Sequence, residues 1–159
     1  ALLPRIFAEV GEHCYFEPPF NANWGCFTHL GKYVYANFNL TLVDDTHIYL
    51  GDHVMIGPNV TICTATHPIH PGLRRQAAQY NKPVHIGNNV WIGAGSTILP
   101  GVTIGENSVI GAGSLVNQDI PANVVAYGTP CRVIRPIQPE DLETYDHGKA
   151  IDFSRWEKE

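Results

Sequence analysis

Aliphatic side chains recur at every sixth position through the central part of this chain. The series is continuous from Ile86 to Val116, and the same phase holds upstream from Leu50 to Ile62. Its members are Leu50, Ile56, Ile62, Ile86, Ile92, Ile98, Ile104, Ile110 and Val116. An α-helix has a period of 3.6 residues, which would place residue i+6 on a different face from residue i. A β-strand has a period of 2, which gives no reason for the pattern to recur every six residues. The pattern therefore predicts neither a helix nor an ordinary strand.

Two further classes of residue follow the same period. Small or β-branched residues lie four positions after each aliphatic residue, at Val54, Val60, Thr66, Val90, Ser96, Val102, Ser108, Ser114 and Ile120. Glycine often follows the aliphatic residue directly, at Gly51, Gly57, Gly87, Gly93, Gly105 and Gly111. Six residues per face with glycine or asparagine at the corner describe a coil that turns after each short strand. Three such faces make a triangular rung of about 18 residues, the hexapeptide type of parallel β-helix.

The pattern divides the chain into three parts. We predict a lead-in over residues 1–29 with a short helix at its start, an all-β coil over 30–137, and a polar tail over 138–159 with a brief helical pattern. Inward aliphatic side chains should stack one rung apart, at about 4.7–4.9 Å. The pair Ile48-Tyr49 shifts the phase by two residues, which indicates a local bulge near the first complete rungs.

The period stops between Pro68 and Pro83. The flanking isoleucines, Ile62 and Ile86, are 24 residues apart, which is four times six. The segment 68–83 is therefore predicted to be a loop extruded from the coil without a change of register. Long loops in compact domains are usually either functional or disordered. We favour function, because His67 adjoins this loop.

Composition and charge narrow the class of protein. The chain has 159 residues, of which 44% are hydrophobic and 16% charged, as expected for one folded domain rather than a disordered chain. Its formal net charge is -5, and its basic residues are scattered. A binder of nucleic acid or of an anionic membrane surface would carry a basic patch, so both partners are excluded.

The four cysteines, Cys14, Cys26, Cys63 and Cys131, form no CxxC pair and no regular framework. A chain of this size does not need disulfides, so we expect reduced thiols in the cytoplasm. We find no signal-peptide pattern, and no apolar run approaches the roughly 18 residues of a membrane span.

Four strings of sequence carry a family resemblance: YANFNLTLVDD, THPIHP, IGNNVWIG and YGTPCRVIRPI. Together with the hexads, from Leu2 to about Ile137, they resemble the galactoside and maltose acetyltransferases of the hexapeptide-repeat family. The string ANFNLTLVDD favours the galactoside branch. The resemblance implies an O-acetyltransferase that moves an acetyl group from acetyl-CoA to a sugar hydroxyl. It also implies a left-handed coil, which is an exception to the usual right-handed crossover.

The resemblance further implies an assembly. Members of the family are homotrimers with each active site between neighbouring subunits. A helical segment before the part that begins here helps to close over the acceptor sugar. Where relatives tend to have Thr-Lys-Asp, this chain has Asn117-Gln118-Asp119, so no lysine is available there to hold coenzyme A.

His67 is the candidate catalytic residue. Acetyl transfer to an alcohol needs a base near neutral pH, and histidine is the usual choice. Among eight histidines, His67 ends the last hexad before the loop and matches the family's catalytic histidine in its THP setting. His67 and His70 also form an HxxH pair, which could indicate a metal site. The pair lacks a third ligand at informative spacing, so no metal is expected.

Three residues are candidates for acceptor binding. The resemblance implies that Asn37 and Asp45 hydrogen-bond the sugar, and it gives Tyr35 a lesser part. Amide and carboxylate groups suit sugar hydroxyls because they donate or accept at fixed angles. The alternative for Asn37 and Asp45 is a structural role, since both residue types favour the corners of coils.

The candidates for coenzyme binding come from later rungs. The resemblance implies that Trp91 lies along the pantetheine and that the Ala94 backbone N–H binds the thioester oxyanion. The alternative for Trp91 is a place in the core or at a subunit interface. Ala112 and Asn117 are expected to line the same groove.

Arg132 and Arg135 are placed by the resemblance to bind the phosphates of the coenzyme. Guanidinium forks suit phosphate oxygens. The two arginines lie three apart after the last rung, so they could equally belong to a solvated terminal strand.

The sequence thus predicts direct acetyl transfer from acetyl-CoA to a galactoside or maltose-like sugar, with His67 as general base. Cys63 is an alternative nucleophile, although it follows an inward isoleucine and has no orienting group. Two other readings stay open: another hexapeptide acetyltransferase acting on serine, an antibiotic or a polyol, and a non-catalytic β-helix scaffold. The identity of the acceptor is not encoded in these patterns.

Overall fold

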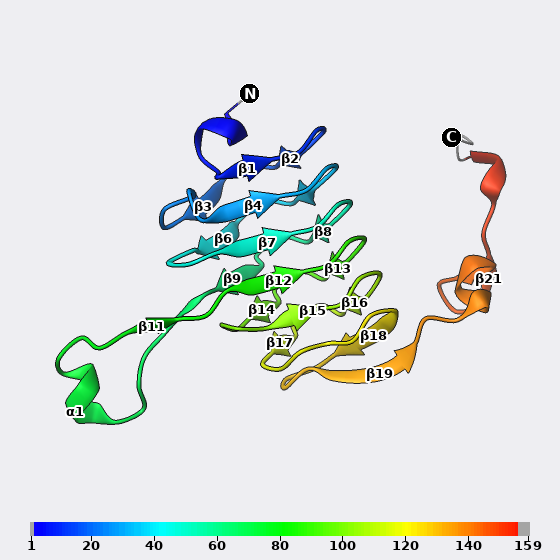
Figure 1. Ribbon diagram of the computed structural model, residues 1–159. Coiled ribbons are helices and arrows are strands. Elements are labelled where there is room, and N and C mark those ends of the chain that lie inside the picture. Colours follow the sequence, from blue (N-terminus) through cyan, green and yellow to red (C-terminus); the bar gives the residue numbers. More distant parts are fainter. Residues whose placement is uncertain (1, 156–159) are drawn as a thin grey trace.

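The fold is a column of triangular rungs, seen in a computed structural model that describes residues 2–155. Strands of successive rungs lie one above the other in three sheets (Figure 1). Sheet A contains β1 (Glu9–Val10), β4 (Thr28–Leu30), β7 (Ile48–Leu50), β12 (Val84–Ile86) and β15 (Thr103–Ile104). Sheet B contains β2 (Tyr15–Phe16), β5 (Tyr35–Ala36), β8 (Met55–Ile56), β13 (Trp91–Ile92), β16 (Val109–Ile110), β18 (Val124–Tyr127) and β19 (Arg132–Pro136). Sheet C contains β3 (Phe20–Ala22), β6 (Leu40–Val43), β9 (Thr61–Cys63), β14 (Thr97–Ile98) and β17 (Leu115–Val116).

The repeated aliphatic residues form the core, as the period predicted. In sheet B, Ile56 pairs with Ile92 and Ile92 with Ile110; in sheet C, Ile62 pairs with Ile98. All of them are fully or almost fully buried. Burying each such side chain contributes about 1.5–3 kcal/mol, which makes these columns the main source of stability. The predicted fold class, a left-handed parallel β-helix with one extruded loop and short helical ends, is confirmed.

The coil begins earlier than the range 30–137 that the aliphatic period indicated. Strands β1, β2 and β3 pair in parallel with β4, β5 and β6, so a complete rung precedes Leu30. Its interior is aromatic: Phe7, Phe16 and Phe20 pack with ring centroids 5.4–5.7 Å apart. Aromatic rings take the interior positions of this rung, so a search for repeated aliphatic residues does not detect it.

The upper rungs are longer than the lower ones by two residues. Leu30 pairs with Leu50, a step of 20, whereas Ile92 pairs with Ile110, a step of 18. The extra residues lie at the corner between β6 and β7, where the sequence predicted a bulge. Asp44 is buried at this corner and accepts hydrogen bonds from the Trp24 backbone N–H (2.9 Å) and the Thr28 hydroxyl (3.1 Å). The wider corner accommodates this buried carboxylate.

The loop leaves the coil at the corner between sheets C and A. It starts and ends as an antiparallel pair, β10 (Ala65–Thr66) and β11 (Tyr80–Asn81), and carries the short helix α1 (Pro71–Arg74). It projects well away from the column (Figure 1). Ile62 pairs with Ile98, 36 residues on, so the loop adds the length of one rung without changing the register.

Both ends of the described chain consist of short elements outside the coil. These are the 3-10 turns η1 (Leu3–Arg5), η2 (Pro139–Leu142) and η3 (Phe153–Arg155) and the two-residue strands β20 (Thr144–Tyr145) and β21 (Lys149–Ala150). The segment after β19 departs from the column (Figure 1). The last four residues of the predicted tail lie outside the described residues. Within residues 2–155, no helix has the length and apolar character that a membrane crossing requires.

Candidate active site

A hollow of about 290 Å³ beside sheet B brings together residues predicted for both substrates. Tyr35 and Asn37, candidates for the acceptor, line it with Trp91 and Ala94, candidates for the coenzyme. Met55 lies between the two groups, because Tyr35, Met55 and Trp91 are partners on consecutive rungs. Their side chains therefore share the outer face of the sheet.

Trp91 and Ala94 are both accessible from solvent. Trp91 is 53% exposed, so it is not a core residue of this subunit. Ala94 is exposed at the corner after β13, and among the described residues nothing accepts a hydrogen bond from its backbone N–H. Gly93 holds this corner close to the next rung, since an added Cβ there would lie 2.5 Å from the Ala112 backbone N. Ala94 and Ala112 thus offer backbone groups along one edge of the coil.

His67 lies on the loop, just beyond β10, and is exposed. Its ring Nδ1 is 2.8 Å from the carbonyl oxygen of Ala78. A carbonyl oxygen can only accept, so Nδ1 carries the proton, and in the neutral ring Nε2 keeps its lone pair. The loop thereby holds the imidazole in the tautomer that a general base requires.

His70 has a different task from His67. Its Nδ1 accepts a hydrogen bond of 3.2 Å from the Gly72 backbone N–H and so caps helix α1. Among residues 2–155, no group of three or more His, Cys, Asp or Glu side chains is arranged to hold a metal ion. The two histidines of the HxxH pair thus have separate contacts, His67 with the Ala78 carbonyl and His70 with the start of α1.

Asp45 belongs to the same corner as the loop. Its carboxylate accepts hydrogen bonds from Asn23 Nδ2 (3.0 Å) and Trp24 Nε1 (3.4 Å). Its backbone oxygen accepts from Asn81 Nδ2 (3.2 Å), on the returning strand of the loop. Asn23 and Trp24 were not predicted, because no period or motif distinguishes them.

The predicted residues lie in two places on the chain. Asn37 and Ala94 lie at the corner between sheets B and C, beside Trp91 in β13 of sheet B, whereas Asp45 and His67 lie between sheets C and A. The two groups of residues are separated by one strand of sheet C and the residues on either side of it. This segment has about five residues, and at ~3.3 Å per residue it spans on the order of 15 Å.

The predicted phosphate ligands already have partners within the chain. Arg132 Nη1 donates to the backbone oxygen of Cys131 (2.7 Å) and, at 3.5 Å, to the side chain of Asn117. Arg135 forms a two-pronged ion pair with Asp141, at 2.7 and 2.8 Å. Hydrogen bonds from Arg135 and from the Gln138 backbone N–H lower the pKa of Asp141 to about 2. The side chain of Arg132 is exposed, so a phosphate could reach its guanidinium group directly. At Arg135, a phosphate would have to compete with the carboxylate of Asp141.

Cys63 is poorly suited to be a nucleophile. Its side chain is half-buried, and burial together with the charge of Asp45 raises the pKa of the thiol. The reactive thiolate is therefore disfavoured at neutral pH. All four cysteines are free thiols.

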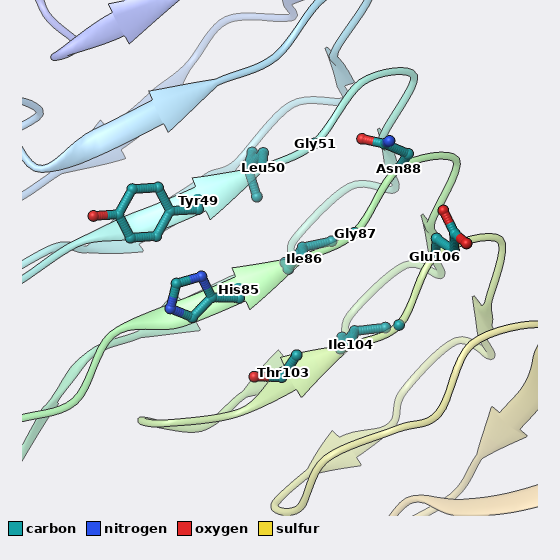
Figure 2. Close-up of a pocket in the computed structure, with 11 residues that line it drawn as sticks. Tyr49, Leu50, Gly51, His85, Ile86, Gly87, Asn88, Thr103, Ile104 and Glu106 are labelled. Carbon is teal, nitrogen blue, oxygen red and sulfur yellow. The ribbon is translucent and has the colours of Figure 1, made fainter.

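A larger hollow, of about 490 Å³, lies on sheet A and contains none of the predicted site residues. Figure 2 shows Tyr49, His85 and Thr103 side by side on the outer face of β7, β12 and β15, with Asn88 and Glu106 at the next corner. The rings of Tyr49 and His85 stack at 4.7 Å. It is an open depression over three rungs, and the candidate chemistry lies elsewhere.

Comparison with known proteins shows the family to which the chain belongs. Residues 83–118 match the family described as bacterial transferase hexapeptide (six repeats). The chain is 63% identical to galactoside O-acetyltransferase of Lactococcus lactis over 98% of its own length and 75% of that protein. The chain belongs to the galactoside and maltose O-acetyltransferase family. The predicted family and enzyme class, an O-acetyltransferase that uses acetyl-CoA, are thereby confirmed.

Solved structures of this family include complexes with the donor. A galactoside acetyltransferase in complex with coenzyme A superposes with a TM-score of 0.93 at 52% identity, over 95% of this chain and 76% of the other. A hexapeptide-repeat acetyltransferase of Vibrio cholerae in complex with acetyl-CoA gives a TM-score of 0.84 at 36% identity, over 86% and 75%. Acetyl-CoA is the co-substrate that the sequence predicted.

Proposed function

We propose that this enzyme acetylates a hydroxyl group of a galactoside or a maltose-like sugar, with His67 as the general base. The observation that carries the proposal is the hydrogen bond between His67 Nδ1 and the Ala78 carbonyl, which leaves Nε2 free to accept a proton. Galactoside O-acetyltransferases are the relatives at 63% and 54% identity, which supports a sugar as the acceptor.

The reaction needs no covalent enzyme intermediate. The sugar oxygen attacks the thioester carbonyl carbon while Nε2 of His67 takes the hydroxyl proton, a contribution of about 10²–10⁴ in rate. The backbone N–H of Ala94 is available to hold the oxyanion of the tetrahedral intermediate. Collapse of the intermediate breaks the C–S bond, and the imidazolium returns the proton to the departing thiolate. The products are the acetyl ester and coenzyme A.

The enzyme acts as a homotrimer in this proposal, with each site built from two subunits. The two places that hold the predicted residues are on the order of 15 Å apart within one chain, and in this proposal a neighbouring subunit brings His67 to Trp91. Exposed side chains on the outer face of sheet B, such as Met55 and Trp91, suit a contact surface. We also place the enzyme in the cytoplasm, since its four free thiols fit a reducing compartment.

An acceptor panel with acetyl-CoA tests the proposal. Release of free thiol is followed with galactosides, maltose, glucose, serine, a polyol and chloramphenicol, and ester formation is verified by mass spectrometry. We expect acetylation of at least one sugar at a rate well above the hydrolysis of acetyl-CoA alone. Transfer to serine, the polyol or the antibiotic in preference to every sugar would favour the rival acetyltransferase reading. No transfer to any acceptor would favour a scaffold.

A further inference from the structure

Trp24 occupies an unusual place for a tryptophan. It lies between β3 and β4, and 65% of it is exposed to solvent, so it does not contribute to the core. Yet it is held at two points: its backbone N–H donates to buried Asp44 at 2.9 Å, and its indole N–H donates to Asp45 at 3.4 Å. A large apolar ring is therefore fixed in position while its faces stay accessible.

Hydrogen bonds and strand pairing connect Trp24 to the loop that carries His67. The backbone oxygen of Asp45 accepts a hydrogen bond from Asn81, and Asn81 pairs with Ala65 at the base of the loop. Ala65 precedes His67 by two residues. Trp24, Asp45 and His67 thus belong to one corner of one subunit, away from Trp91 in sheet B.

We propose that Trp24 is the stacking platform for the pyranose ring of the acceptor, a step that rests on the proposed function. An indole offers an apolar face with few rotatable bonds, and its polar edge here is already satisfied by Asp45. A pyranose ring has C–H groups on its two faces and hydroxyl groups around its edge. One face can therefore pack on the indole of Trp24 while hydroxyl groups at the edge hydrogen-bond the carboxylate of Asp45.

The carboxylate of Asp45 has capacity left for this role. It has about four lone-pair positions, of which the hydrogen bonds from Asn23 and Trp24 use two. The remaining positions can accept from hydroxyl groups of a sugar lying against the indole. Because the donor candidates Trp91 and Ala94 lie away from this corner, at sheet B and the corner that follows it, loss of the Trp24 ring should weaken acceptor binding and leave donor binding unchanged.

The test compares Trp24→Ala and Trp24→Phe with wild type, using the best sugar from the panel. Tyr145→Ala is the matched control, since Tyr145 is 58% exposed and lies in the terminal segment. We expect Trp24→Ala to raise the KM for the sugar by roughly tenfold or more, with the KM for acetyl-CoA within about twofold of wild type. Trp24→Phe should retain most of the affinity, and Tyr145→Ala should match wild type.

The outcomes separate this inference from the function on which it rests. If wild type acetylates no sugar, the proposed function fails, and the platform fails with it. If wild type acetylates sugars but Trp24→Ala keeps its KM for the sugar, only the platform is refuted. Light scattering on each variant detects a third case, in which Trp24→Ala loses subunits and raises both KM values together. That result would make Trp24 an assembly contact and would also refute the platform.

Discussion

His67 Nδ1 lies 2.8 Å from the carbonyl oxygen of Ala78, and this contact fixes which nitrogen can act as a base. The carbonyl is presented by a short turn after α1, in which Ala77 adopts a positive φ of 56°. This left-handed conformation costs a non-glycine residue roughly 1–2 kcal/mol. The loop therefore holds a strained residue, Ala77, next to the carbonyl that orients the His67 ring.

Ala77 should accept glycine but not a β-branched residue. Ala77→Gly adopts a positive φ without strain, so kcat should stay within about twofold of wild type. Ala77→Val is much more strained there, and the shift of the Ala78 carbonyl should lower kcat by roughly tenfold. Steady-state kinetics at saturating substrates measure both. A wild-type kcat for Ala77→Val would show that this turn does not orient His67.

Gly93 should tolerate no side chain. A Cβ at this position would lie 2.5 Å from the Ala112 backbone N, so Gly93→Ala must push two rungs apart. We expect a loss of about 2–3 kcal/mol in the free energy of unfolding, the upper part of the range for overpacking. Gly95→Ala is the control, because its Cβ would have open space and only the positive φ of 69° costs energy, about 1 kcal/mol. Denaturant unfolding at one protein concentration gives both values; equal losses would refute the packing argument.

Release of Arg135 from Asp141 should strengthen coenzyme binding. Asp141→Asn removes the competing charge, so the Kd for coenzyme A should fall by roughly two- to fivefold, whereas Arg135→Ala should raise it. The double variant should resemble Arg135→Ala. Titration calorimetry measures each Kd, and an unchanged Kd in Asp141→Asn would argue against a phosphate role for Arg135.

The same ion pair predicts little pH dependence near neutrality. The pKa of Asp141 is lowered from 3.8 to about 2, so the contribution of the pair is fully present above about pH 4 and is lost as pH falls toward 2. Coenzyme affinity should therefore show no step from this carboxyl between about pH 5 and 8.

Cys63 should be dispensable for chemistry. Its thiol has a raised pKa and is half-buried, so Cys63→Ala should keep kcat within about twofold of wild type. Thiol release in the acceptor assay measures this. A loss of 100-fold or more, with the fold intact by circular dichroism, would revive a cysteine route.

The sequence was sufficient to predict the coil but not its first rung. Isoleucines such as Ile62 and Ile98 repeat because every rung needs an aliphatic residue at the same interior position. Phe7, Phe16 and Phe20 fill the interior of the first described rung instead. A periodic rule describes the repeating interior and fails at its boundary.

In the candidate site, too, the sequence indicates the residues that lie in a motif but not the contacts that they make in the folded chain. His67 is a candidate from sequence because its neighbours in sequence carry the THP motif. Its partner Ala78 could not, since a backbone carbonyl has no sequence signature. Trp24 beside Asp45 and Asp141 beside Arg135 are also contacts that only the folded chain creates.

Replacement of the base itself tests the central claim most directly. His67→Ala should lower kcat by about 10²–10⁴-fold with the best sugar acceptor, while the Kd for coenzyme A stays at the wild-type value. His70→Ala is the control, because His70 only caps α1, and it should keep most of the activity. A His67→Ala enzyme with near-native kcat would contradict the account and require another route for the hydroxyl proton.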